Sequence, residues 1–115
     1  MNFLQTAIRK LIERELATLA AKGYTFQLDY ELEDGDDITY SDENIDALME
    51  GIYAVDMATV YCNYEGAPAG GVLLIPCNDY DIVSDWTYST DDPGGIYDAP
   101  IAAWNRIIKE LETVS

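Results

Sequence analysis

The spacing of apolar residues at the start of the chain predicts an amphipathic helix from Phe3 to Ala21. Apolar positions recur every three or four residues, so they fall on one stripe of a helix. The stripe consists of Phe3, Leu4, Ala7, Ile8, Leu11, Ile12, Leu16, Leu19 and Ala20. Gly23 stands where a left-handed C-terminal cap belongs, and Lys22 just before it complements the helix dipole.

The next segment, from Tyr24 to Leu32, alternates strictly between apolar and polar residues. Successive side chains of a strand point to opposite faces, so this pattern predicts a half-buried strand with one wet face. The wet face carries Thr25, Gln27, Asp29 and Glu31. An acidic loop, Glu33 to Asp37, is expected to follow.

A short second helix is predicted after Ser41, which suits an N-cap. Asp42 and Glu43 would then lie in its first turn, where carboxylates interact favourably with the helix dipole. The helix is expected to end near Gly51. Its buried stripe would be Ile45, Leu48, Met49 and Ile52.

Two strands, Met57 to Tyr64 and Gly71 to Cys77, are predicted around a loop from Glu65 to Gly70. In such a hairpin Cys62 would face residues near Val72, and Cys77 would face residues near Met57. The two cysteines would not be cross-strand partners, so we expect two free thiols in the core rather than a disulfide.

The last third of the chain predicts one more strand and a final helix. Asp81 to Tyr88 is a candidate strand, entered by a turn at Asn78-Asp79. After a turn at Asp91 to Gly95, a helix is expected from about Ala99 to Glu112, with Asp98 as its cap. Its inner stripe would be Ile101, Trp104, Ile107, Ile108 and Leu111.

These elements together predict a single α+β domain over residues 1–115. Their order is α-β-α-β-β-β-α, and sequential strands joined by short loops imply antiparallel pairing. We therefore expect a three- or four-stranded antiparallel sheet with helices on one face. A chain of 115 residues with 49% hydrophobic residues can bury a core.

Charge changes this picture of an ordinary small domain. The formal net charge is −16, and no Lys, Arg or His occurs between Gly23 and Asn105. A one-signed surface repels itself and destabilises the compact state, so packing does not require this segregation. The six basic residues lie near the two ends: Arg9, Lys10, Arg14, Lys22, Arg106 and Lys109. On the first helix we expect Arg9 to pair with Glu13 at i,i+4.

The amino-acid composition excludes the commonest kinds of catalytic site. The chain has no His, so Ser-His-Asp and Cys-His arrangements are impossible, and two cysteines without a C-x-x-C motif make no zinc site. Calcium fits no better: an EF-hand loop starting at Asp29 meets Asp34 where glycine is required, and one starting at Asp34 has Ile38 at position five. We expect no enzymatic activity, no cofactor and no specific metal.

Other partners and locations are narrowed by the same composition. Direct binding of nucleic acid is disfavoured, because phosphate contacts depend on Lys and Arg. The longest apolar run, Val72 to Ile75, is far too short to span a membrane, and the start of the chain does not have the pattern of a signal peptide. The expectation is a cytoplasmic protein without membrane contact.

The acidic side chains themselves are the remaining candidate site. On the predicted second helix Asp42, Asp46 and Glu50 would place a carboxylate about every 6 Å along one row. On the wet face of the first strand Asp29 and Glu31 would repeat about every 6.6–6.8 Å. Such rows can imitate a nucleic-acid backbone toward a basic partner. The full candidate surface is Asp29, Glu31, Glu33, Asp34, Asp36, Asp37, Asp42, Asp46 and Glu50, and Tyr40, Tyr80, Tyr88 and Tyr97 could add contact area.

Two segments also carry a resemblance to known proteins. Residues 44–48, Asn-Ile-Asp-Ala-Leu, lead to Tyr-Ala-Val-Asp-Met-Ala-Thr-Val at 53–60, and Pro76 to Trp86 contains an asparagine turn followed by Ile-Val-Ser-Asp. This combination resembles small acidic proteins of bacteriophages, prophages and plasmids. The resemblance implies inhibition of host defence, because several anti-restriction and anti-CRISPR proteins use acidic surfaces. It assigns no catalytic residues.

The leading hypothesis is therefore a non-enzymatic inhibitor that mimics nucleic acid and occupies the basic channel of a partner such as a host-defence nuclease complex. A second hypothesis is a protein-interaction module or homodimer that acts through the broad apolar face of the first helix. A third is a small metal-binding or enzymatic domain.

Overall fold

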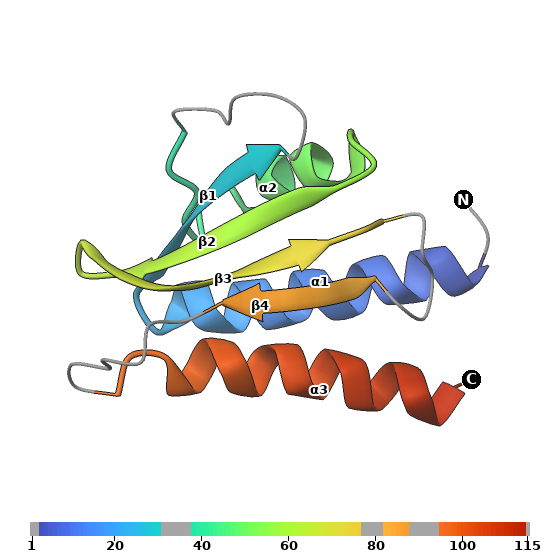
Figure 1. Cartoon of the computed structure of the whole chain (residues 1–115). Coiled ribbons are helices and arrows are strands. Elements are labelled where there is room, and N and C mark those ends of the chain that lie inside the picture. The colour runs from blue at the N-terminus through green and yellow to red at the C-terminus, as the bar shows by residue number, and fades with distance from the viewer. Residues whose placement is uncertain (1–2, 31–37, 77–81, 88–94, 115) are drawn as a thin grey trace.

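The computed structural model describes residues 3–30, 38–76, 82–87 and 95–114. Within them the chain forms three helices and a four-stranded antiparallel sheet in the order α-β-α-β-β-β-α (Figure 1). The α+β class and the order of elements are thus confirmed. The elements are α1 (Phe3–Ala21), β1 (Tyr24–Tyr30), α2 (Ile45–Tyr53), β2 (Ala58–Tyr64), β3 (Ala67–Leu74), β4 (Val83–Thr87) and α3 (Asp98–Val114).

The sheet is a simple meander in which each strand pairs with the next one along the chain, β1-β2-β3-β4. The helices form one layer on one face of this sheet (Figure 1). In that layer α1 lies between α2 and α3, with α2 packed on β1 and α3 packed on β3 and β4. Figure 1 looks onto the opposite face of the sheet, which carries none of these helices.

The core lies between the helical layer and the sheet. Alternate strand residues point into this core. Two of them, Phe26 and Leu28 of β1, are at most 2% exposed. Most of the apolar stripe of α1 is buried in the same core: Ile8, Ile12, Leu16, Leu19 and Ala20. The fold therefore uses the stripe of α1 internally, because α1 is the middle helix of its layer.

The hairpin between β2 and β3 differs from the predicted one. The expected loop from Glu65 to Gly70 is wrong, since Tyr64 pairs with Ala67 and only two residues form the turn. Both of them, Glu65 and Gly66, have positive φ (50° and 82°), as a type I′ turn requires. Further from the turn, the pairing of β2 with β3 shifts at an irregularity near Gly70, which also has positive φ. As a result Val72 pairs with Val60 rather than facing Cys62.

Glu65 is an unusual residue for its backbone conformation, and this leads to a prediction. We expect Glu65→Asn to stabilise the protein by roughly 0.5 kcal/mol, because asparagine adopts the left-handed region at lower cost than glutamate. Urea denaturation measures the change. Glu65→Gln removes the same charge without that backbone preference and serves as the control; equal stability of the two variants would contradict the explanation.

The second helix begins later than predicted. Its first residue is Ile45, so the prediction that Asp42 and Glu43 occupy its first turn is wrong. Ser41 to Asn44 form a separate turn: the Asn44 N–H donates to the Ser41 carbonyl at 3.1 Å, and the Asn44 side chain accepts from the Ser41 N–H at 2.6 Å. Asn44, rather than Ser41, therefore occupies the N-cap position. Local bonding of these polar side chains competes with helix here.

The remaining boundaries agree with prediction to within a few residues. Gly23 has φ of 100°, which confirms the left-handed cap after α1. The candidate strand near Asp81 exists as β4, and α3 includes Asp98 as its first residue instead of following it. Leu32, the loop from Glu33 to Asp37, the turn at Asn78-Asp79 and most of the turn before Gly95 lie outside the described residues.

Candidate interaction surfaces

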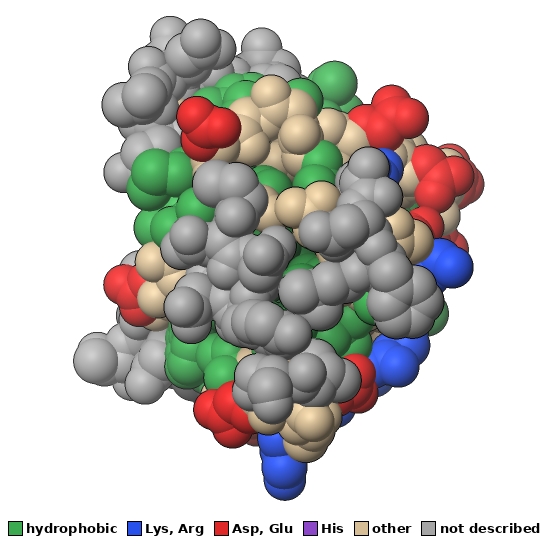
Figure 2. Space-filling view, turned by 90° about the vertical axis from the view of Figure 1, so that its right-hand side faces the viewer, with side chains coloured by type: hydrophobic (Ala, Val, Ile, Leu, Met, Phe, Trp, Pro, Cys, Tyr) green, Lys and Arg blue, Asp and Glu red, His purple; other side chains and the backbone are tan. Residues whose placement is uncertain are grey.

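The basic residues at the two ends of the sequence come together in the structure. Arg9, Lys10 and Arg14 belong to α1, while Arg106 and Lys109 belong to α3, and these two helices pack side by side. Figure 2 shows the Lys and Arg side chains gathered along one side of the molecule. The described residues of the sheet, of α2 and of their connections carry no basic side chain.

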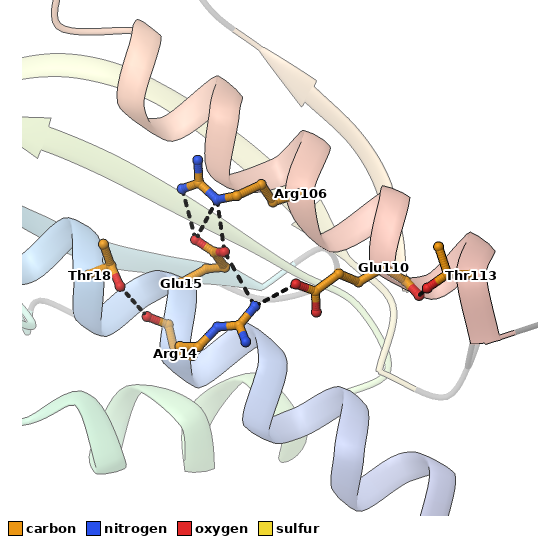
Figure 3. Close-up of polar contacts among 6 residues, drawn as sticks. All are labelled: Arg14, Glu15, Thr18, Arg106, Glu110 and Thr113. Carbon is orange, nitrogen blue, oxygen red and sulfur yellow. Dashed lines mark hydrogen bonds and ion pairs between the residues drawn. The ribbon is translucent and has the colours of Figure 1, made fainter.

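An ionic cluster joins α1 to α3 (Figure 3). Glu15 of α1 has a side chain only 5% exposed, and the Arg106 guanidinium donates to both of its carboxylate oxygens, with Nε–Oε1 at 3.0 Å and Nη2–Oε2 at 2.9 Å. Arg14 lies 3.7 Å from Glu15 and 2.8 Å from Glu110 of α3. The hydrogen bond to Glu15 raises the pKa of Arg106 above its ordinary value.

Arg9 makes a different contact from the one predicted. Its guanidinium carbon lies 5.1 Å from the centre of the Tyr53 ring at the end of α2, a cation–π arrangement, instead of pairing with Glu13. Burial raises the pKa of Tyr53 to about 12, partly opposed by the positive charge of Arg9. Two of the chain's six basic residues, Arg14 and Arg106, thus neutralise carboxylates, and Arg9 faces an aromatic ring.

The acidic residues at α2 are exposed and have no cationic partner among the described residues. Asp46 and Glu50 lie one helical turn apart on the side of α2 that points away from the buried residues Ile45 and Leu48. One turn of helix separates such carboxylates by about 6 Å along the axis. Asp42 is also exposed but precedes the helix, so the predicted helical row of three is shortened to two.

Asp29 does not belong to the same surface as the α2 carboxylates. Its neighbours in β1, Leu28 and Tyr30, point toward the helical layer and lie against Gly51 of α2. Because side chains alternate along a strand, Asp29 points to the opposite face of the sheet. The other predicted members, Glu31, Glu33, Asp34, Asp36 and Asp37, lie outside the described residues.

The tyrosines expected to add contact area are not at this surface where the structure describes them. Tyr40 and Tyr97 are buried, at 4% and 6% exposure, so their expected contribution is wrong. Tyr40 forms an isolated bridge with Phe26 and belongs to the core. Tyr80 and Tyr88 lie outside the described residues.

The open face of the sheet is a second exposed surface, of which the sequence analysis selected only the part on the first strand, through Asp29 and Glu31. Strand pairing places its side chains in rows across the strands. One row runs Gln27, Tyr61, Gly71, and the next runs Asp29, Thr59, Leu73, Asp85. Tyr61 is 42% exposed and lies across Gly71, where an added Cβ would come 2.9 Å from its ring. The alternation of Thr59, Tyr61 and Asn63 was the available signal for this face.

Among the described residues, the structure shows no other candidate chemistry. No group of three or more Cys, Asp and Glu side chains there is arranged to hold a metal ion. Cys62 is a free thiol in the core, and burial raises its pKa to about 12. Cys77 lies outside the described residues. None of the helices, within the part of the chain that is described, has the length and apolarity to cross a membrane.

The chain was compared with protein-family models, with curated proteins and with solved structures. None of the three comparisons found a match. The surfaces must therefore be interpreted from their own geometry and charge.

Proposed function

We propose that this protein is a non-enzymatic, acidic binding protein that imitates nucleic acid toward a basic partner, such as a host-defence nuclease complex. The observation that carries the proposal is the separation of charge. The ion pairs of Arg14 and Arg106 lie at the α1–α3 contact, whereas Asp42, Asp46 and Glu50 are exposed and have no cationic partner among the described residues.

Physical chemistry supports this use of the charge. Unneutralised carboxylates at regular spacing create a negative potential that attracts basic surfaces and accelerates association at low salt. A protein that binds phosphates presents such a basic surface. The same potential repels nucleic acid itself, so the partner is the nucleic-acid-binding protein and not its ligand.

The alternative of a homodimer through the apolar face of the first helix loses its motivation. Among the described residues of that face, Ile8, Ile12, Leu16, Leu19 and Ala20 are buried, Leu11 is partly buried and Ala7 is exposed. A broad apolar stripe is what the middle helix of a layer needs, since it contacts elements on three sides.

The proposal is tested with Asp46→Asn combined with Glu50→Gln. We expect roughly fivefold weaker binding to purified basic nucleic-acid-binding proteins at low salt, because two charges facing the partner are removed. Isothermal titration calorimetry at several salt concentrations measures the affinity, which should fall steeply as salt rises.

The matched control is Glu65→Gln combined with Asp98→Asn, which removes two exposed carboxylates elsewhere on the molecule. Its affinity should stay close to that of the unmodified protein. Equal weakening by both double variants would show that only total charge matters. Binding that is insensitive to salt, or no binding to any basic protein, would refute the proposed function.

A further inference from the structure

The open face of the sheet has the composition of a contact surface rather than of an ordinary wet face. Its described charged residues, Asp29 and Asp85, are both acidic, and between them lie neutral side chains. An exposed tyrosine at the centre, with charge kept to the edges, is the usual arrangement of a protein interface. The helices leave this face uncovered (Figure 1).

We propose that the basic partner makes a second contact, beyond the α2 carboxylates, on this open face, with Tyr61 as the central anchor and Asp29 and Asp85 as flanking charges. The inference rests on the proposed function and adds a specific site to it. The partner surface would present an apolar or aromatic side chain toward Tyr61 and Leu73, with a Lys or Arg on either side.

Tyr61 is suited to be an anchor because the fold already holds it in place. Gly71, directly opposite on β3, has no side chain, so the Tyr61 ring lies across the strand with Cδ1 at 2.9 Å from where a Cβ would stand. Thr59, the next residue on the same face of β2, also borders Gly71. A side chain that is ordered before binding loses less entropy on association, which favours affinity.

The flanking carboxylates define the charge and the reach of the partner. Asp29 and Asp85 end the same row, which crosses four strands through Thr59 and Leu73. Three inter-strand spacings separate them by about 14 Å. An extended peptide covers a similar distance between residues i and i+4, at about 3.4 Å per residue. Two cations would therefore match the ends of this row, and an apolar residue midway between them would meet Leu73 in the row and Tyr61 in the adjoining row.

Charge complementarity favours a basic protein on this face over nucleic acid, an anionic membrane or a second copy of the chain. Nucleic acid and anionic membranes would meet like charge. A second copy would bring its own Asp29 and Asp85 to the interface, and each copy carries a net charge of −16. A basic protein is the partner that meets opposite charge at both described charged residues of this face, Asp29 and Asp85.

The test is an NMR titration of the whole ¹⁵N-labelled protein with the synthetic peptide Arg-Thr-Trp-Thr-Arg at low salt. We expect saturable shifts of the amides of Gln27, Tyr61, Leu73 and Asp85, with smaller shifts on α2. Replacing the central Trp of the peptide by Ala should weaken binding about fivefold, since aromatic anchors dominate such contacts.

Variants separate the anchor from the charges. Tyr61→Ala should weaken binding of the peptide about fivefold at every salt concentration. Asp29→Asn with Asp85→Asn should weaken it at low salt and flatten its salt dependence. Ile38→Ala, which removes an exposed hydrophobic residue with no place in these rows, and Glu65→Gln with Asp98→Asn are the controls and should change little.

The outcomes distinguish this inference from the proposed function. Saturable shifts confined to α2, or diffuse shifts without saturation, would overturn the docking site while leaving the acidic binding function in place. Shifts of the open face that depend on protein concentration without peptide would identify a second copy as the occupant and overturn it too. No shift anywhere at low salt would refute both.

Discussion

Replacing Arg106 by methionine should destabilise the protein by about 2–4 kcal/mol. Methionine keeps much of the aliphatic stem but leaves the Glu15 carboxylate, with a side chain 5% exposed, without its bidentate partner. Removing the more exposed partner of such an ion pair is costly, because the carboxylate that remains is buried away from water and has lost that counter-charge. We place the loss below the usual range for buried pairs because Arg14, 3.7 Å away, can approach Glu15. Urea denaturation monitored by circular dichroism measures the change.

Two further variants make the test specific. Glu15→Gln should cost only about 1 kcal/mol, since glutamine still accepts one hydrogen bond and Arg106, with a side chain 47% exposed, remains solvated. Arg14→Met removes the same residue type from an ion pair whose side chains are 58% and 50% exposed, and should cost under about 1 kcal/mol. If Arg106→Met lowered the free energy of unfolding no more than Arg14→Met, the Glu15–Arg106 ion pair would not contribute to stability as proposed.

The thiol of Cys62 should react about a thousandfold more slowly in the folded protein than in urea at pH 8. Burial raises the pKa of Cys62 from 9.0 to about 12, so the thiolate that attacks a disulfide reagent is scarce in the fold. A colorimetric disulfide reagent measures the rate on a Cys77→Ser variant, in which Cys62 is the only thiol. Reaction in the folded state within tenfold of the rate in urea would show that β2 opens readily.

The same pKa change predicts how stability depends on alkaline pH. The unfolded state loses the Cys62 proton above about pH 9, whereas the folded state keeps it until about pH 12. Its contribution is therefore complete below pH 9 and is lost as the pH rises toward 12. Tyr53, whose pKa rises from 10.0 to about 12, acts in the same direction. Cys62→Ala should make the decline in stability shallower over this range.

The spacing of apolar residues predicted the helices and strands well, because an element with one buried face must carry apolar residues at its own structural period. The stripe of α1 and the alternation of β1 each reflect one buried face, and both elements appear at the expected positions. The predictions failed where a local interaction competes with the periodic pattern. Asn44 and Ser41 bond within a turn and delay α2. Glu65 accepts a positive φ that its side chain disfavours, so no residue preference signalled the two-residue turn.

The candidate surfaces were less predictable than the elements. The exposure of Asp42, Asp46 and Glu50 followed from their polar positions, but the relation of Asp29 to them did not. It depends on which face of β1 the helices cover, and that is settled by packing between distant segments. The prominence of Tyr61 likewise depends on its pairing with Gly71, ten residues further along the chain.

By itself the sequence determined the alternation of elements, the acidity of the chain and the confinement of basic residues to its two ends. These follow from residue types and their spacing. The tertiary structure decided that the two ends lie side by side, so Arg14 and Arg106 neutralise carboxylates of α1 and α3 and none on α2 or the open sheet face. It could do so because helix packing and strand register join residues far apart in the chain, and no local pattern records those pairings.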